Sequence, residues 1–342
     1  METEVSAKAS PVTNGILQWG KFADYLPDAV LGVDNLQTAI PQIAKDAALL
    51  KDIGRAVRRL PSQHLLLRGD ARDLLLPNSS VHLVVTSPPY WTLKEYRDTP
   101  GQMGHIENYE AFIKELDRVW QVCYRALVPG GRLVCVVGDV CLSRRKNAGR
   151  HTVVPLHASI QESCRRIGFD NLAPIIWHKI ANAAYEAENG SGGFLGKPYE
   201  PNAVVKNDIE FILMERKSGG YRSPEPATRI LSLISAEDHK VWFQQIWTGL
   251  TGASTRNHPA PYPQELADRL IRMFSFVGDT VLDPFLGAGT TSVAAALAGR
   301  NSIGTEIDPH YFGGAVQRLK HESSSLFQNV KIETGEVNTN GI

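Results

Sequence analysis

The sequence predicts an α/β fold built on a mainly parallel sheet with helices on both faces. From Gln63 onward, short apolar runs alternate with amphipathic helical stretches, which is the pattern of strand–helix–strand units. Two of these runs stop at loops rich in proline or glycine, as buried strands do at a sheet edge. The 342 residues suffice for one large domain or two modest ones, and a hydrophobic content of 43% is typical of globular proteins.

The first 61 residues are predicted to form a helical appendage. Within it, 37–60 reads as a helix, because Ile40, Ile43, Ala44, Ala48 and Leu49 recur at helical spacing. Whether this part serves docking, oligomerisation or grip on a substrate is left open. The region 62–320 carries the alternation of strands and helices, and 321–342 is expected to be a tail.

Seven segments between 62 and 320 are predicted as strands and four as helices. Tyr109–Leu127 is the strongest helix, with Asn108 as its N-cap and Pro129 just beyond its end. The glycine-rich stretch 182–201 and the connector 218–257 are expected to be insertions. The strands are expected at 65–70, 81–85, 132–139, 172–178, 209–215, 274–283 and 302–306, and the other helices at 155–167, 264–274 and 292–297.

The run 81–85 ends at Ser87-Pro88-Pro89-Tyr90. The prolines end the strand because they carry no N–H for a sheet ladder, so carbonyl groups at the strand end lack donors. An acceptor-rich corner beside an aromatic ring suits an exocyclic amine on a flat base. The alternative for this stretch alone is an ordinary strand that ends at proline.

A second stretch, Thr280–Thr291, combines a strand with the glycine loop Asp283-Pro284-Phe285-Leu286-Gly287-Ala288-Gly289. No lysine follows the last glycine, so the loop is not a P-loop. The next strand ends at Glu306, about twenty residues later, which is the spacing of an acid that holds a ribose hydroxyl. The pattern predicts a nucleoside-type cofactor; the alternative is a tight turn without a ligand.

Together the two stretches resemble the amino-methyltransferases of DNA, over roughly residues 62 to 320. Their catalytic motif is Asp/Asn/Ser-Pro-Pro-aromatic and their cofactor loop is similar to Asp283–Thr290. Because the catalytic motif comes first here, the chain resembles the circularly permuted β group. The resemblance implies a Rossmann-like class I methyltransferase fold with a seven-stranded sheet, in which the strands before Ser87 and through Asp283 lie side by side.

The resemblance also implies roles for individual residues. The Ser87 side chain and the Pro88 carbonyl would accept the amine hydrogens, with Pro89 completing the corner and Tyr90 stacking on a flipped base. The cofactor would be S-adenosylmethionine, with Glu306 on its ribose and Asp70 as the candidate for its adenine amine. The implied cofactor-binding residues are Asp70, Pro261, Tyr262, Asp283, Pro284, Phe285, Gly287, Gly289, Thr290, Thr291, Glu306 and Ile307.

The implied reaction is methyl transfer to the N4 amine of cytosine in double-stranded DNA, since Ser-Pro-Pro-Tyr is typical of that type within the family. Adenine N6 methylation is the alternative of the same fold. Methylation of a protein amide, and a binding module without activity, are the alternatives of other classes. A prokaryotic cytoplasmic location, a cognate restriction endonuclease and a monomeric or homodimeric state are further expectations.

Charge and cysteine content bear on the partners. Lys plus Arg and Asp plus Glu are 36 each, so the net charge of zero gives DNA binding no general support. A local cluster, Arg144, Arg145, Lys146 and Arg150, is nevertheless predicted to contact phosphates, the alternative being a solvated face. The four cysteines form no C-x-x-C pair, so no metal site is predicted. No run is long enough for a membrane span, and no secretory signal pattern opens the chain.

Overall fold

The computed structural model describes residues 17–94, 96–142, 147–179, 207–252, 262–324 and 329–337. Its α-helices are α1 (Asp28–Leu31), α2 (Leu36–Ile43), α3 (Ala47–Val57), α4 (Tyr109–Ala126), α5 (Leu156–Ile167), α7 (Pro226–Leu231), α8 (Ala236–Trp242), α9 (Gln264–Phe274), α10 (Thr290–Leu297) and α11 (Pro309–Ser324). Short 3₁₀ turns lie at Ala23–Tyr25, Ala71–Asp73 and Met103–His105. No helix in these ranges has the length and apolarity needed to cross a bilayer.

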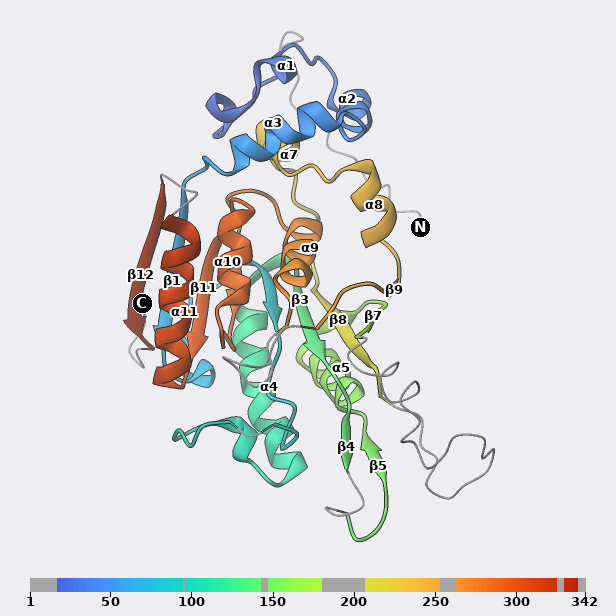
Figure 1. The fold of residues 1–342 in the computed structure, drawn as a ribbon, viewed down its shortest axis with the longest axis vertical. Coiled ribbons are helices and arrows are strands. Elements are labelled where there is room, and N and C mark those ends of the chain that lie inside the picture. The colour runs from blue at the N-terminus through green and yellow to red at the C-terminus, as the bar shows by residue number, and fades with distance from the viewer. Residues whose placement is uncertain are drawn as a thin grey trace, which may run out of the picture.

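The strands form one large sheet and a separate hairpin (Figure 1). Along the large sheet the order is β12-β1-β11-β10-β2-β3-β8-β7-β9, and β6 pairs with β8. The strands are β1 (Ser62–Arg68), β2 (Val81–Thr86), β3 (Leu127–Val137), β4 (Val140–Leu142), β5 (Thr152–Val154), β6 (Phe169–Asn171), β7 (Ile175–His178), β8 (Ile209–Lys217), β9 (Ile246–Trp247), β10 (Thr280–Asp283), β11 (Asn301–Glu306) and β12 (Val330–Glu336).

The predicted mainly parallel α/β sheet is confirmed. β12, β1, β11, β10, β2 and β3 run parallel, and β8 is antiparallel to β3 and β7. The sheet has ten strands rather than the seven expected. The additions are β6, β9 and β12, of which β6 and β9 have three and two residues, too short for periodicity to reveal.

Alternation along the central strands explains why helices cover both faces. On β2, Leu83 and Val85 pack in the cluster that contains α9 and part of α10, whereas Val84 packs in the cluster that contains α4 and α5. Successive side chains of a strand point to opposite faces, so a run that is apolar at every position must be buried on both. The continuous run that predicted the strand therefore also required two helical layers.

Two expectations at the ends of the chain are corrected. The helix expected over 37–60 is two helices, because Asp46 caps a new helix by accepting hydrogen bonds from Ala48 N and Leu49 N at 3.0 and 2.9 Å. The stretch 321–342 is not a simple tail: α11 continues to Ser324, and β12 pairs with β1 along its whole length. That pairing covers a sheet edge that would otherwise expose unpaired N–H and C=O groups.

Candidate functional site

The two motifs meet at the carboxyl edge of the sheet, as expected from their positions at strand ends. β2 and β10 are adjacent parallel strands, with Leu83 beside Val281 and Val84 beside Leu282. The two strand ends are joined by a buried hydrogen bond, in which Thr86 Oγ1 donates to Asp283 Oδ1 at 2.7 Å. Segments about two hundred residues apart in sequence therefore form one crevice at the edge where α/β proteins bind ligands.

The carboxylate of Asp283 accepts hydrogen bonds from several elements around this crevice, but the residue does not line its cavity. Besides the bond from Thr86, its carboxylate accepts hydrogen bonds from Thr291 Oγ1 at 2.6 Å, Phe285 N at 3.1 Å and Tyr262 Oη at 3.3 Å. Burial raises the pKa of Asp283, and these donors oppose the shift. The carboxylate thus links β10 to β2, α10 and the start of α9, and it fixes the loop that follows it.

The cavity beside this loop is lined by both predicted motifs. Its walls are Gly69, Asp70, Ala71, Ser87, Pro89, Tyr96, Gly101, Gln102, Met103, Pro284, Phe285, Gly287, Thr305, Glu306, Ile307 and Tyr311. Its volume is about 50 Å³, far below the roughly 300–1,000 Å³ of small-molecule pockets. A bound nucleoside therefore needs more room than this conformation of the cavity provides.

Glu306 is placed as the spacing predicted, at the end of β11 and facing the glycine loop. Gly287 N donates to its Oε2 at 2.8 Å and Asp308 N donates to its Oε1 at 2.9 Å. Burial raises the pKa of Glu306 to about 7, and the two backbone donors oppose this shift. Each carboxylate oxygen retains a further lone pair, so the group can accept hydroxyl donors from a ribose.

Asp70 also lines the cavity, but its carboxylate is already engaged. Arg72 donates to it from its backbone N at 2.9 Å and through its guanidinium, which also bonds Glu115 Oε2 at 2.6 Å. The neighbouring segment closes over this side, where Thr99 Oγ1 donates to Asp308 Oδ2 at 2.6 Å. The adenine amine of a bound cofactor would donate to the Asp70 carboxylate, whose orientation is fixed by Arg72.

The remaining predicted cofactor residues divide into walls and supports. Pro284, Phe285, Gly287 and Ile307 line the cavity, whereas Gly289, Thr290, Thr291 and Tyr262 are not part of its lining. Gly289 has a φ of 75°, and a Cβ there would lie 3.1 Å from that of Ala315, so glycine is required where the loop turns into α10. Pro261 lies outside the described residues.

Tyr90 belongs to a chain of hydrogen bonds that ends at a charged pair. Ser87 Oγ donates to Tyr90 Oη at 3.2 Å, and Tyr90 Oη donates to Glu210 Oε2, also at 3.2 Å. Lys179 Nζ donates to the other oxygen of Glu210 at 2.6 Å. Tyr90 is buried, and burial with the nearby Glu210 charge raises its pKa well above the ordinary value, so the phenol stays protonated.

Sequence reasoning did not identify Glu210, Lys179 or Asp139 as site residues. Asp139 follows β3 and accepts a hydrogen bond from His157 at 2.6 Å, with the His157 ring stacked on Phe211. An acid at a strand end, the signal used for Asp70 and Glu306, would have found it. Glu210 could not be found this way, because it reaches this edge at the start of an antiparallel strand.

The β4–β5 hairpin extends from the end of β3 and carries Arg150, one residue of the predicted phosphate-binding cluster (Figure 1). Arg150 is exposed there, while Arg144, Arg145 and Lys146 lie outside the described residues, as does the stretch 182–201. β4 continues from the catalytic edge through Gly138 and Asp139, so the hairpin starts beside Ser87 and not at the far end of the sheet.

Comparison with known proteins identifies the family. A family model described as DNA methylase matches residues 81–317. The Type II methyltransferase M.MjaI of Methanocaldococcus jannaschii is 37% identical over 280 residues, covering 73% of this chain and 88% of that protein. M.MthZI of Methanothermobacter thermautotrophicus is 36% identical over 277 residues, covering 75% of each.

Solved structures agree with this match. TTHA0409 of Thermus thermophilus, in complex with S-adenosyl-L-methionine, is 51% identical with a TM-score of 0.64, covering 79% of this chain and 99% of that one. The cytosine-N4-specific PvuII DNA methyltransferase is 19% identical with a TM-score of 0.53, covering 82% and 98%, and this likeness shows the fold alone. The chain belongs to the N6/N4 family of DNA methyltransferases that use S-adenosylmethionine.

Proposed function

We propose that this enzyme transfers the methyl group to the N4 amine of a cytosine flipped out of double-stranded DNA. One observation carries the proposal: Ser87 and Pro89 line the same cavity as the cofactor-loop residues Pro284 and Gly287 and the acid Glu306. A base amine held by the first motif would therefore lie beside a cofactor held by the second. Serine as the first residue of the motif favours cytosine over adenine, by resemblance to the N4 enzymes.

The hydrogen-bond chain supports an acceptor role for Ser87. Tyr90 Oη donates toward two acceptors, Glu210 Oε2 at 3.2 Å and the Val136 carbonyl at 3.3 Å, so its proton is engaged there and Ser87 donates its own proton to Tyr90. The lone pairs of Ser87 Oγ are left to accept a hydrogen from the amine. With the Pro88 carbonyl as second acceptor, the amine nitrogen becomes more pyramidal and its lone pair is released from the ring.

The cofactor assignment rests on the same cavity. Bound S-adenosylmethionine supplies an electrophilic methyl group. Glu306 would hold the ribose hydroxyls, Gly287 would let the backbone approach, and Asp70 would accept from the adenine amine. Stacking of Tyr90 on the base requires its ring face to be uncovered, since Tyr90 is 7% exposed and packs against Gly138.

We also propose that the enzyme contacts DNA phosphates through the hairpin cluster and works beside a cognate restriction endonuclease. The names of the Type II relatives support the second point. The position of the hairpin beside the catalytic edge supports the first, because a flipped base and its flanking phosphates must reach one face of the protein together.

The methylated nucleoside that the enzyme produces shows whether its target is cytosine or adenine. DNA from a host without methylases, expressing either this chain or its Ser87→Ala variant, is digested to nucleosides for mass spectrometry. We expect N4-methylcytosine with the wild type and little with the variant. N6-methyladenine would replace the cytosine assignment with the adenine alternative, and absence of both products would refute the proposal.

A further inference from the structure

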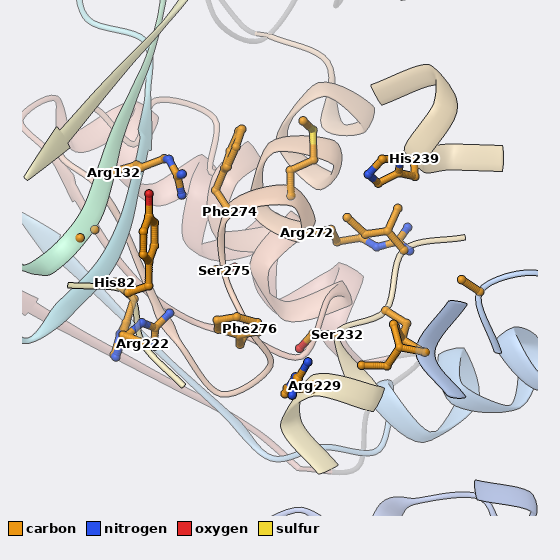
Figure 2. A pocket seen from close by; sticks show the side chains of 18 of the residues that line it. His82, Arg132, Arg222, Arg229, Ser232, His239, Arg272, Phe274, Ser275 and Phe276 are labelled. Carbon is orange, nitrogen blue, oxygen red and sulfur yellow. The ribbon is translucent and has the colours of Figure 1, made fainter. Parts of the chain in front are cut away.

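A second and larger cavity lies at the opposite, amino-terminal edge of the sheet (Figure 2). Its volume is about 720 Å³. The walls come from the end of α2, the start of β3, the segment 220–239 that includes α7, and the end of α9 with the loop after it. The polar and aromatic side chains that matter below are Lys45, His82, Arg132, Arg222, Arg229, His239, Arg272, Phe274 and Phe276.

This cavity is separate from the methyl-transfer crevice. β2 begins beside it at His82 and reaches the crevice only at Ser87, so the two lie about 17 Å apart along one strand. A volume of 720 Å³ is within the usual size range of small-molecule pockets, so the cavity suits a small molecule.

The charges around the cavity are unbalanced. Five arginine or lysine side chains line it, and none of its described lining residues is acidic. Arg222 is neutralised from behind by Asp279, through bonds of 2.7 and 2.6 Å, and Arg272 lies 3.6 Å from Asp268. Arg132 and Arg229 have no carboxylate partner in the part of the chain that the structure describes.

The surroundings of Arg132 show why the unpaired positive charge in this cavity is unfavourable. Its guanidinium lies over the Phe274 ring at 5.1 Å, and its buried Nε has no hydrogen-bond partner among the described residues. Burial lowers the pKa of Arg132; the nearby Tyr221 opposes this shift, and Arg216 beside it adds to it. A partly buried cation without a counter-charge destabilises a fold, and an anion from solution would remove that penalty.

We propose that this cavity binds a phosphate-bearing small molecule of nucleotide size, with the unpaired cations Arg132 and Arg229 as candidate phosphate contacts. Arginine matches the geometry of phosphate oxygens, and the two side chains come from different walls, β3 and α7. Ile40, Leu233 and Met273 supply apolar lining for the rest of the ligand. Since α2 and α7 also share a hydrophobic cluster, the bound anion would fasten the N-terminal helices to the catalytic sheet.

Calorimetry of the full chain tests the site with ATP as the probe. Saturating S-adenosylhomocysteine keeps ATP out of the cofactor crevice. The variant R132Q/R229Q removes both unpaired cations, and R58Q/R59Q makes the same change in charge on exposed residues just after α3. We expect one ATP per chain, binding to R132Q/R229Q at least about tenfold weaker, and binding to R58Q/R59Q unchanged.

Two further probes identify the chemistry. Inorganic pyrophosphate should bind the wild type and lose affinity in R132Q/R229Q, whereas uncharged adenosine should not bind. Failure of both ATP and pyrophosphate to bind, equal binding to all three proteins, or displacement of ATP by a short DNA duplex would overturn the proposal. If R132Q/R229Q does not fold, R229Q alone, which leaves the sheet untouched, must still weaken ATP binding several-fold.

Discussion

The two edges of the central sheet differ in how they hold buried charge. At the carboxyl edge, the carboxylates of Asp283, Glu306 and Glu210 all accept hydrogen bonds from neighbouring donors. Toward the amino edge, the described residues that line the cavity beside Arg132 include no carboxylate, and no hydrogen bond of normal geometry among the described residues reaches the buried carboxylate of Glu215 on β8, although the Gln161 side chain partly offsets its raised pKa. The buried charges at the carboxyl edge are paired within the protein. Toward the amino edge, Arg132 needs an anion as ligand and Glu215 needs a proton.

The difference has a physical meaning for function. A satisfied carboxylate keeps its position and charge, so it can present its remaining lone pairs to an amine or hydroxyl in a fixed geometry. An unsatisfied charge lowers stability until something binds it. We therefore expect substitutions at the carboxyl edge to impair the protein, and substitutions at the unsatisfied groups to leave it as stable or more so.

Asp283→Ala should give the largest effect. It removes the acceptor of four hydrogen bonds and leaves Thr86 Oγ1 and Phe285 N without this partner, while Thr291 retains the Val85 carbonyl, so unfolding in urea should show a loss of about 3–5 kcal/mol. The exposed Asp34→Asn is the control and should change nothing. A loss below about 1 kcal/mol would mean that the carboxylate does not hold the strand ends together.

Ser87→Ala should lower kcat and kcat/KM together by about a hundredfold, because the acceptor acts mainly in the transition state. DNA affinity should stay within about twofold, since stacking and phosphate contacts remain. The matched control is Ser80→Ala, which makes the same change at the other end of β2, where Ser80 Oγ donates to Pro77 O at 2.7 Å. Single-turnover methylation at the wild-type rate by Ser87→Ala would refute the role of this hydroxyl.

Glu306→Gln should weaken S-adenosylmethionine binding by about 1–3 kcal/mol in calorimetry. Because the pKa of Glu306 lies at about 7, wild-type affinity should fall as the pH drops through 7 and the carboxylate takes up a proton. The variant, which cannot ionise there, should lack this dependence. The exposed Glu237→Gln should keep the wild-type profile, and a wild-type affinity that is flat between pH 6 and 8 would contradict the ribose assignment.

Neutralising Arg144 and Arg150 of the predicted phosphate-binding cluster should change DNA binding and no other property of the enzyme. In R144Q/R150Q the slope of log affinity against log salt should flatten by about two units, one per lost phosphate contact. The R58Q/R59Q protein, with its charge change just after α3, should keep the full slope. If R144Q/R150Q retains both slope and affinity, the cluster is a solvated face.

Glu215→Gln should give the smallest effect and the opposite sign. Burial raises the pKa of Glu215 from its ordinary 4.5 to about 7, although the Gln161 side chain offsets part of the shift. The folded protein therefore holds a proton that the unfolded chain releases, so wild-type stability falls as the pH rises from 4.5 to 7. The variant should be more stable than the wild type by about 1–2 kcal/mol at pH 8, with much less gain at pH 5. Equal melting temperatures at pH 8 would show that the carboxylate has a partner.

The sequence by itself determined the local features of this protein. Apolar runs located the central strands, Asn108 marked the start of α4, and the glycine loop with Glu306 predicted a cofactor crevice. The resemblance paired that crevice with Ser87. These inferences succeeded because caps, turns and side-chain periodicity depend on neighbours only a few residues away.

Only the tertiary structure decided which distant groups meet. The reversed direction of β8 brings Glu210 to Tyr90, 120 residues earlier, and completes the hydrogen-bond chain to Ser87. Pairing of β12 with β1 and the arrangement of α2, α7 and α9 around Arg132 are likewise choices among remote partners. No local pattern encodes them, because the free energy that selects a strand neighbour or a cavity wall comes from burial across the whole fold.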